Sequence, residues 1–322
     1  MRFPLWDWIE AHAGCRYDLA QSGMRGSIPP PRWPPRRPGA DTADRLREEL
    51  ADHLGVARER LFLARGASEA NAWVLGHLAR RSHGRTRRLR VRYPEYPPLF
   101  EAGRLLGFSL VQDPAPAQVA AVSQPRNPEG DLWERSMLES WADGSSEQLV
   151  DETFREFAGT PSLARRGERH LWTTGSFTKF FGADEVRVGF AVAPPEGVAP
   201  FERYVGLVSN ELAPASAAMA LGLLRGIRRV RRAVTAVVEP NLDALGRLFP
   251  SLPRPRAPVA FDRLPREDGL VLAKRCLRAS IRVCPGGFFG ERRAVRLCLT
   301  RRDGPATLRV YRRVRDRAGP SR

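Results

Sequence analysis

Short apolar stretches alternate with amphipathic segments between residues 61 and 193. The segments 69–81 and 96–107 repeat their apolar positions with the spacing that is typical of a helix. The strand-like stretches are short and end at polar or turn residues; they are 61–65, 89–93, 119–123, 148–152, 170–176 and 188–193. Strands that alternate with helices in this way predict an α/β fold with a mostly parallel sheet.

The segments before and after this alternating region have patterns of their own. The first forty residues are rich in proline and arginine, and proline runs do not form packed helices, so we expect an irregular arm there. Residues 41–55 have a capping residue, helical periodicity and a closing glycine, which predict a helix. Long helical patterns occupy about 207–247, and strands near 280–285 and 294–300 precede a final helix. We therefore expect an N-terminal arm (1–40), a large domain (41–205) and a small C-terminal α+β domain (206–322).

The composition is that of an ordinary globular protein. The chain has 322 residues, of which 42% are hydrophobic. No apolar run approaches the roughly 20 residues of a membrane helix, and the N-terminus has no signal-peptide pattern. The four cysteines form no CxxC pair, and the five histidines have no metal-ligand spacing. We therefore expect a cytoplasmic protein that has no metal site and does not enter a membrane.

The net charge of +17 raises the possibility of a nucleic-acid partner. The arginines are spread along the whole chain, however, and no helix-turn-helix, zinc-finger or RNA-binding pattern accompanies them. Such a charge favours non-specific binding to polyanions. We therefore expect no specific nucleic-acid partner.

Lysine is very rare in this chain. Of the 53 basic residues, the only lysines are Lys179 and Lys274. A buried lysine amine can lose its proton and attack a carbonyl, which a guanidinium cannot do. Lys274 lies in a helix-like stretch, where a solvated charge is expected. Lys179 follows a predicted strand, and this position makes it the candidate nucleophile.

A serine hydroxyl and an arginine guanidinium lie near Lys179 in the sequence. Ser176 precedes it by three residues, and Arg187 follows eight residues later, at the start of the next strand. Such a set suits a phosphorylated aldehyde, because Ser176 and Arg187 can bind the phosphate while the lysine forms an imine. The pattern SxxK also occurs in β-lactamase-type enzymes, so this signal is weak by itself.

Further candidates also follow predicted strands, where ligands bind in parallel sheets. The turn containing Ala67 and Ser68 opens a helix and could bind an anion, or it could simply cap the helix. Asp151 could pair with a protonated pyridine nitrogen, or it could be a solvated loop acid. Asn127 could donate to a phenolic oxygen or belong to an Asn-Pro turn, and Tyr96 could stack on a ring or pack in the core.

The last candidate is Arg296, which lies in a late strand-like stretch. Its planar guanidinium could bind a substrate carboxylate with two hydrogen bonds. Composition alone does not distinguish it from the many other arginines of the chain.

Taken in order, these motifs resemble the fold-type I pyridoxal phosphate (PLP) enzymes, in particular the class I/II aminotransferases. The similar motifs span about residues 41–300; they are Gly66-Ala67-Ser68-Glu69, Pro94-Glu95-Tyr96, Asn127-Pro128-Glu129-Gly130, Asp151-Glu152, Ser176-x-x-Lys179 with Arg187, and Pro285-Gly286 through Gly290 with Arg296. The resemblance implies the aspartate aminotransferase-like fold and a homodimer with the active site near the subunit interface.

The resemblance also implies a role for each candidate. Lys179 would form the Schiff base with PLP and move the proton, and Asp151 would hold the pyridinium. The phenolic oxygen would be bound by Asn127 and the ring face by Tyr96. The phosphate would be bound by Ala67, Ser68, Ser176 and Arg187, and the substrate carboxylate by Arg296.

The chain departs from the family in several places, one of which is a short interval between Gly130 and Asp151 that leaves less room for a helix. Phe154 stands where the family has a tyrosine. The family also often has a tyrosine that binds the partner's phosphate just before the first helix; here that segment, PPRRPGADTAD, has none, and Arg36 or Arg37 could substitute. Phe154 and the run Thr178-Lys179-Phe180 resemble the threonine-phosphate decarboxylases of cobalamin synthesis, and histidinol-phosphate aminotransferases are close relatives of that branch.

We therefore expect an aminotransferase acting on an amino acid or a phosphorylated amine, which an arginine-rich pocket would suit. A PLP-dependent decarboxylase is the alternative. A PLP-binding regulator is disfavoured because no DNA-binding domain precedes the first helix, and an inactive homologue stays possible because the tyrosines are missing.

Overall fold

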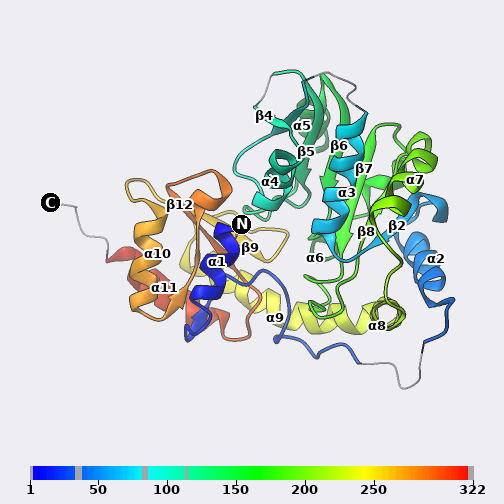
Figure 1. The fold of residues 1–322 in the computed structure, drawn as a ribbon. Helices are drawn as coiled ribbons and strands as arrows, with labels where there is room; N and C mark the ends of the chain where they lie inside the picture. Colours follow the sequence, from blue (N-terminus) through cyan, green and yellow to red (C-terminus); the bar gives the residue numbers. More distant parts are fainter. Residues whose placement is uncertain (1–2, 33–37, 82–85, 113–114, 318–322) are drawn as a thin grey trace.

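The computed structural model of the chain describes residues 3–32, 38–81, 86–112 and 115–317. Figure 1 shows two groups of elements, with the long helix α9 (Ile227–Leu248) extending from one to the other. One group is built around a seven-stranded sheet and the other around a three-stranded sheet.

The seven-stranded sheet has the order β2-β8-β7-β6-β5-β3-β4. Its strands are β2 (Leu61–Ala64), β3 (Arg88–Val91), β4 (Ser109–Val111), β5 (Ala117–Ser123), β6 (Ser145–Asp151), β7 (Leu171–Ser176) and β8 (Gly189–Val192). The four pairs from β4 to β7 are parallel, whereas β8 is antiparallel to both β7 and β2. The mostly parallel sheet expected from the sequence is thus confirmed. The register aligns Ser123 with Asp151 and Asp151 with Thr174, so the strand ends meet at one edge.

Helices cover the sheet on both sides. They are α2 (Thr42–Leu54), α3 (Ala67–Arg80), α4 (Pro97–Leu105), α5 (Arg135–Ala142), α6 (Arg155–Ala158), α7 (Val198–Val208) and α8 (Pro214–Arg225). The predicted helix at 41–55 is α2, which ends at Gly55 in the left-handed conformation, with φ of 69°. Leu149 and Trp172 of the sheet are fully buried together with Val74 of α3, which fixes this helix against the strands.

The smaller sheet has the order β11-β12-β9, with antiparallel pairs. Its region contains β9 (Val259–Arg263), α10 (Gly269–Arg278), β10 (Ile281–Arg282), β11 (Cys284–Pro285), β12 (Ala294–Cys298) and α11 (Gly304–Asp316). Arg296 lies on the central strand, opposite Cys284 and Phe261. Lys274 is exposed on α10, as expected for a solvated charge.

The expectation of a wholly irregular arm was wrong. The chain forms helix α1 (Pro4–Ala11) and the short strand β1 (Tyr17–Asp18), which pairs in parallel with β10. Helix α1 is stable there because Leu5 is buried and the Trp8 indole donates to the Val283 carbonyl at 2.8 Å. Proline at its first position suits a helix start. The expected domain limits stay a prediction.

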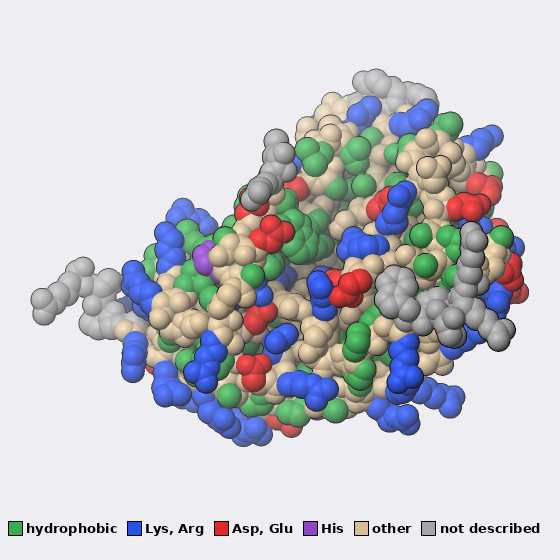
Figure 2. Space-filling model, turned by 60° about the horizontal axis from the view of Figure 1, so that its bottom comes forward, with side chains coloured by type: hydrophobic (Ala, Val, Ile, Leu, Met, Phe, Trp, Pro, Cys, Tyr) green, Lys and Arg blue, Asp and Glu red, His purple; other side chains and the backbone are tan. Residues whose placement is uncertain are grey.

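Arg36 and Arg37, considered above as substitutes for a partner tyrosine, lie outside the described residues. Figure 2 shows basic side chains spread over the viewed face, with acidic side chains among them. No described helix is both long enough and apolar enough to cross a membrane.

Candidate active site

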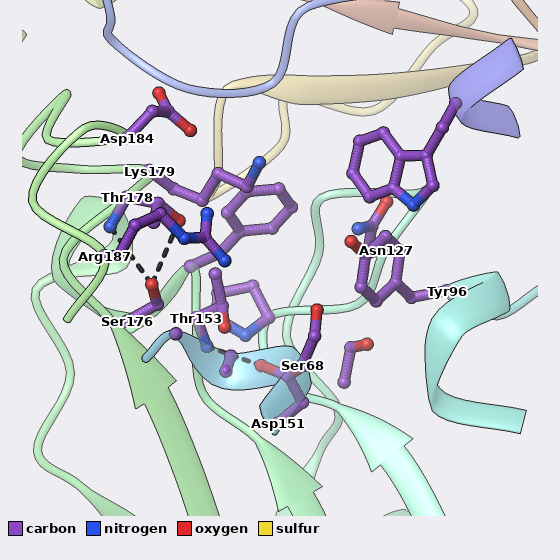
Figure 3. Close-up of a pocket in the computed structure, with 16 residues that line it drawn as sticks. Ser68, Tyr96, Asn127, Asp151, Thr153, Ser176, Thr178, Lys179, Asp184 and Arg187 are labelled. Atoms are coloured by element: carbon purple, nitrogen blue, oxygen red, sulfur yellow. Dashed lines mark hydrogen bonds between the residues drawn. The ribbon is translucent and has the colours of Figure 1, made fainter. Parts of the chain in front are cut away.

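A cavity of about 380 Å³ lies where β5, β6 and β7 end. We call it the main cavity. It is lined by eight of the residues predicted from the sequence, namely Ala67, Ser68, Tyr96, Asn127, Asp151, Ser176, Lys179 and Arg187 (Figure 3). The remaining one, Arg296, lines an adjoining cavity of about 250 Å³, the side cavity. The two cavities share Trp6, Tyr96, Lys179 and Asp184.

Asp151 lies at the floor of the main cavity and is held in place from two directions (Figure 3). Its Oδ1 accepts from the backbone N–H of Thr153 at 2.9 Å, and its Oδ2 accepts from Nδ2 of Asn71 at 3.0 Å. The Thr174 hydroxyl in turn donates to Oδ1 of Asn71 at 2.6 Å. The Asp151 side chain is 3% exposed. The carboxylate is therefore fixed at a strand end with its charge facing the cavity.

The Lys179 amine points into the middle of the main cavity (Figure 3). The Lys179 carbonyl accepts from the backbone N–H of Met24 at 2.9 Å, which anchors this part of the loop. Burial lowers the pKa of the Lys179 amine; the carboxylate of Asp184 opposes this shift, and Arg296 and Arg187 add to it. A lowered pKa makes the amine more available as a nucleophile or base.

One end of the main cavity is suited to an anion. Helix α3 begins there, and the first backbone N–H groups of a helix have no partner within the helix. Gly66 precedes α3 with φ of 108°, a conformation that favours glycine. Arg187 lies beside this turn and donates to the Arg65 carbonyl at 3.1 Å. Arg187 itself has φ of 52°, which is strained for a residue with a side chain.

Ser176 completes this end of the cavity. Its hydroxyl oxygen accepts from the backbone N–H of Thr178 at 3.1 Å and lies 3.0 Å from the Thr178 hydroxyl. A helix N-terminus, a guanidinium and a hydroxyl therefore face the same space, a combination that binds phosphate groups.

Arg296 lines the side cavity and contacts Asn127, which lines the main cavity. It is 2% exposed, and its guanidinium lies 4.7 Å from the centre of the Phe289 ring. One NH2 group donates to Oδ1 of Asn127 at 3.2 Å and the other to the Ala20 carbonyl at 3.1 Å. Because Arg296 contacts the Asn127 oxygen, the Asn127 amide nitrogen is left to donate into the main cavity. The buried Nε of Arg296 has no partner among the described residues.

Tyr96 lies on the side of the main cavity opposite Arg187 (Figure 3). The buried Glu95 fixes its backbone, because a Glu95 oxygen accepts from the Tyr96 N–H at 2.6 Å. The same carboxyl accepts from the Ser123 hydroxyl at 2.5 Å and from the Ser123 N–H at 2.9 Å. Burial raises the pKa of Glu95 to about 8, although these hydrogen bonds oppose the shift.

Several residues of the site were not predicted as such from the sequence, among them Asn71, Glu95, Trp6 and Asp184. Asn71 comes from the buried face of α3, and Glu95 was read only as a spacer in the motif Pro-x-Tyr. Trp6 comes from α1, which was not expected, and Asp184 from the loop that follows Lys179. The short spacing between Lys179 and Asp184 was the one available signal, since residues so close in a loop can line one cavity. Among the described residues, no group of three or more potential ligands could hold a metal ion.

The fold and the cavity define an α/β protein with a central lysine, an anion site and an opposing carboxylate. A family model, "Aminotransferase class I and II", matches residues 109–305, which is more than half of the chain. The chain belongs to this family.

Comparisons with individual proteins agree with this assignment. The chain is 28% identical over 181 residues to histidinol-phosphate aminotransferase 2 of Archaeoglobus fulgidus, with 51% of each chain covered. The match therefore spans about half the length of this curated relative. The structure resembles a PLP-dependent aminotransferase from Streptococcus suis, with a TM-score of 0.80 and 16% identity, covering 100% of this chain and 99% of that one.

A second solved structure has the same fold. It is a probable N-succinyldiaminopimelate aminotransferase from Thermus thermophilus, with a TM-score of 0.79, 19% identity and coverage of 97% and 98%. The expected PLP-dependent transferase fold is thus confirmed.

The residues present fit PLP, the cofactor that the family implies. The cofactor has a phosphate, a ring nitrogen and an aldehyde, and the main cavity offers an anion site, the Asp151 carboxylate and the Lys179 amine for these groups. The buried hydroxyl of Thr153 also lines the cavity and has no partner among the described residues. Unpartnered buried polar atoms of this kind are expected where a polar ligand binds.

Proposed function

We propose that this protein is a PLP-dependent aminotransferase that moves an amino group between an amine donor and a keto acid. The observation that supports the proposal best is that eight residues from distant parts of the sequence line one cavity, with Lys179 between a carboxylate and an anion site. Membership of the class I and II family supports it independently.

The residues would divide the binding of PLP and substrate among them. The α3 N-terminus, Ser176 and Arg187 would bind the phosphate, Asn127 would donate to the phenolic oxygen, and Tyr96 would cover the ring. Arg296 would bind the carboxylate of the donor, because its two-point hydrogen bonding matches that group. These contacts would orient the donor with its Cα towards Lys179.

Two residues would perform the chemistry. When bound, PLP would withdraw electrons from the Cα of a donor attached through its amino group, which makes the proton on that carbon removable. Asp151 would keep the ring nitrogen protonated, since Thr153 and Asn71 hold its carboxylate in place. Lys179 would carry the proton from Cα, and burial, which lowers the pKa of its amine, favours the unprotonated form that a base needs.

A decarboxylase is the second candidate, favoured by one observation. Phe154 lines the main cavity at the position where the family has a tyrosine, so a phenol that would contact the cofactor is absent from that position. In a decarboxylase the bond to the carboxylate would break in place of the bond to the Cα proton. A homodimer and a cytoplasmic location belong to the proposal as well.

The experiment that separates the two functions uses the purified protein loaded with PLP. Amino acids, threonine phosphate and histidinol phosphate are offered as donors, and keto-product release, carbon dioxide and the visible absorbance are followed. An aminotransferase releases a keto or aldehyde product without carbon dioxide and loses the visible band until a keto acid is added. Carbon dioxide release with the visible band restored after each turnover would replace the proposal with the decarboxylase.

A further inference from the structure

The side cavity lies next to Lys179 and Arg296 and has room for the side chain of a donor. Its volume is about 250 Å³. An apolar wall comes from α1, through Leu5, Trp6 and Ile9. Trp6 is 38% exposed, so part of its ring is open to a ligand. An aromatic ring in such a wall can contact an alkyl chain or a cation.

The arginines that line the side cavity are already paired with carboxylates or assigned to the donor's carboxylate. Arg282 is bound by both oxygens of Asp18, at 2.6 and 3.2 Å, and Arg25 pairs with Glu185 at 2.9 Å. Arg296 is the arginine that the proposed function assigns to the donor's carboxylate. A second anionic group on the donor would therefore find no unpaired arginine among the described residues that line this cavity.

Asp184 is the carboxylate of the side cavity. Among the described residues, no arginine, lysine or histidine lies within ion-pair distance of it, whereas Asp18 and Glu185 each have an arginine. Its carboxylate lies above the Lys179 side chain, as Figure 3 shows. The Lys179 amine is close enough for the charge of Asp184 to affect its pKa, and in the proposed reaction this amine would be attached to PLP until a donor replaces it. A cationic side chain that enters the side cavity would therefore meet an Asp184 carboxylate that no described arginine already pairs with.

The loop that carries Asp184 is held firmly. Gly182 has φ of 60°, and a Cβ there would lie 3.0 Å from the backbone carbon of Met24 and 3.1 Å from the backbone nitrogen of Arg25. A Cβ on Gly23 would in turn lie 3.2 Å from the Thr178 carbonyl. The loop therefore packs against residues 23–25 at backbone contact distance, two residues before Asp184.

We propose that the side cavity binds the donor's side chain and that Asp184, with the Trp6 ring, selects donors whose side chain carries a cationic nitrogen group, such as a guanidinium, ammonium or imidazolium. The inference rests on the proposed function, because Lys179 and Arg296 are taken to fix the donor's amine and carboxylate. It differs from the expectation of a phosphorylated donor, which rested on the resemblance of Phe154 and the run Thr178-Lys179-Phe180 to enzymes that take phosphorylated amines.

The test compares two donors of nearly the same shape, arginine and citrulline, which differ in side-chain charge. Binding is measured by calorimetry on the PLP-loaded protein after borohydride reduction, so that no turnover occurs. We expect arginine to bind roughly tenfold more tightly than citrulline, as for a charged hydrogen bond that citrulline lacks. Asp184→Asn should remove this ratio, and Asp184→Ser provides a second variant with the same expected loss.

Controls separate this inference from the proposed function. Glu202→Gln removes an exposed carboxylate on α7 and should keep the ratio. Equal binding of arginine and citrulline, tighter binding of phosphoserine than of arginine, or an unchanged ratio in the Asp184 variants would overturn the inference. Loss of the ratio in these variants, with no donor converted by the unreduced protein, would support the role of Asp184 and contradict the aminotransferase function.

Discussion

At the scale of single residues, the site contains two carboxyl groups in different environments. Asp151 accepts hydrogen bonds from Thr153 and Asn71 at the floor of the main cavity. Glu95 lies behind Tyr96, and burial raises its pKa to about 8. The first is placed to face a ligand as an anion, whereas the second is placed to hold the backbone of the cavity wall.

Replacing Asp151 by asparagine should leave PLP bound but nearly inactive. A neutral amide cannot keep the ring nitrogen protonated, so the pull on the Cα electrons is lost. We expect a loss of roughly two orders of magnitude or more in the rate of donor conversion, as for removal of a key electrostatic contact. Single-turnover absorbance measurements give the rate, and PLP titration gives the affinity. Wild-type rates in this variant would show that Asp151 has no role in the reaction.

Glu95 makes the stability of the protein depend on pH. Its pKa is raised from 4.5 when unfolded to about 8 in the folded protein. The folded state therefore binds this proton more tightly, and the stability it contributes is lost as pH rises from about 4.5 to 8. Each pKa unit corresponds to about 1.4 kcal/mol, so the effect should reach a few kcal/mol.

Glu95→Gln keeps the hydrogen-bonding shape without the titration. Compared with the wild type, this variant should lose less stability between pH 5 and pH 8, as measured by urea unfolding at several pH values. Glu202→Gln, an exposed carboxyl on α7, should follow the wild-type profile. Parallel profiles for wild type and Glu95→Gln would mean that Glu95 is ionised in the folded protein throughout this range.

At the scale of elements, the anion site depends on how closely β8 approaches the start of α3. A Cβ on Gly189 would lie 2.4 Å from the backbone carbon of Gly66 and 2.7 Å from the backbone nitrogen of Ala67. No side chain can be accommodated there unless the backbone shifts. The absence of a side chain at Gly189 therefore sets the distance between Arg187, two residues earlier, and the α3 N-terminus.

Gly189→Ala should accordingly displace the start of α3. We expect a loss of about 1–3 kcal/mol in the free energy of unfolding, as for overpacking of a tight contact, together with weaker PLP binding. The matched control is Gly246→Ala on the exposed side of α9, where a Cβ would meet nothing within 4 Å. That variant should gain about 0.5–1 kcal/mol. Equal stability of the two variants would show that the β8–α3 contact does not matter.

The elements that could be predicted from sequence are those with a strong local pattern. The strands that carry Asp151 and Ser176 were predicted because each is a short buried run with a polar residue at its end. Helix α1 was missed because it has only eight residues, and its stability comes from contacts with distant residues, such as the hydrogen bond from Trp8 to Val283, 275 positions away. Asn71 was missed because the sequence alone does not show that this polar residue lies on a buried helix face with Asp151 and Thr174 as hydrogen-bond partners.

At the scale of the whole molecule, the two cavities lie where distant parts of the chain meet. Arg296 comes from β12, Trp6 from α1 and Lys179 from the loop after β7, and all three line the side cavity. The sequence motifs predicted the residues around PLP because their order along the chain is typical of the family. They could not predict the side cavity, since its walls are made by tertiary contacts between α1, residues 20–25 and the small sheet.

The central claim is that Lys179 binds PLP covalently, and the lysine content of the chain allows a direct test. The wild type, Lys179→Arg and Lys274→Arg are loaded with PLP, treated with borohydride, digested and examined by mass spectrometry. Arginine keeps the charge but cannot form the covalent bond, so Lys179→Arg should lose the visible band and the reduced adduct. Lys274, exposed on α10, should be dispensable for both. A reduced PLP adduct on Lys274, or one retained in Lys179→Arg, would contradict the account.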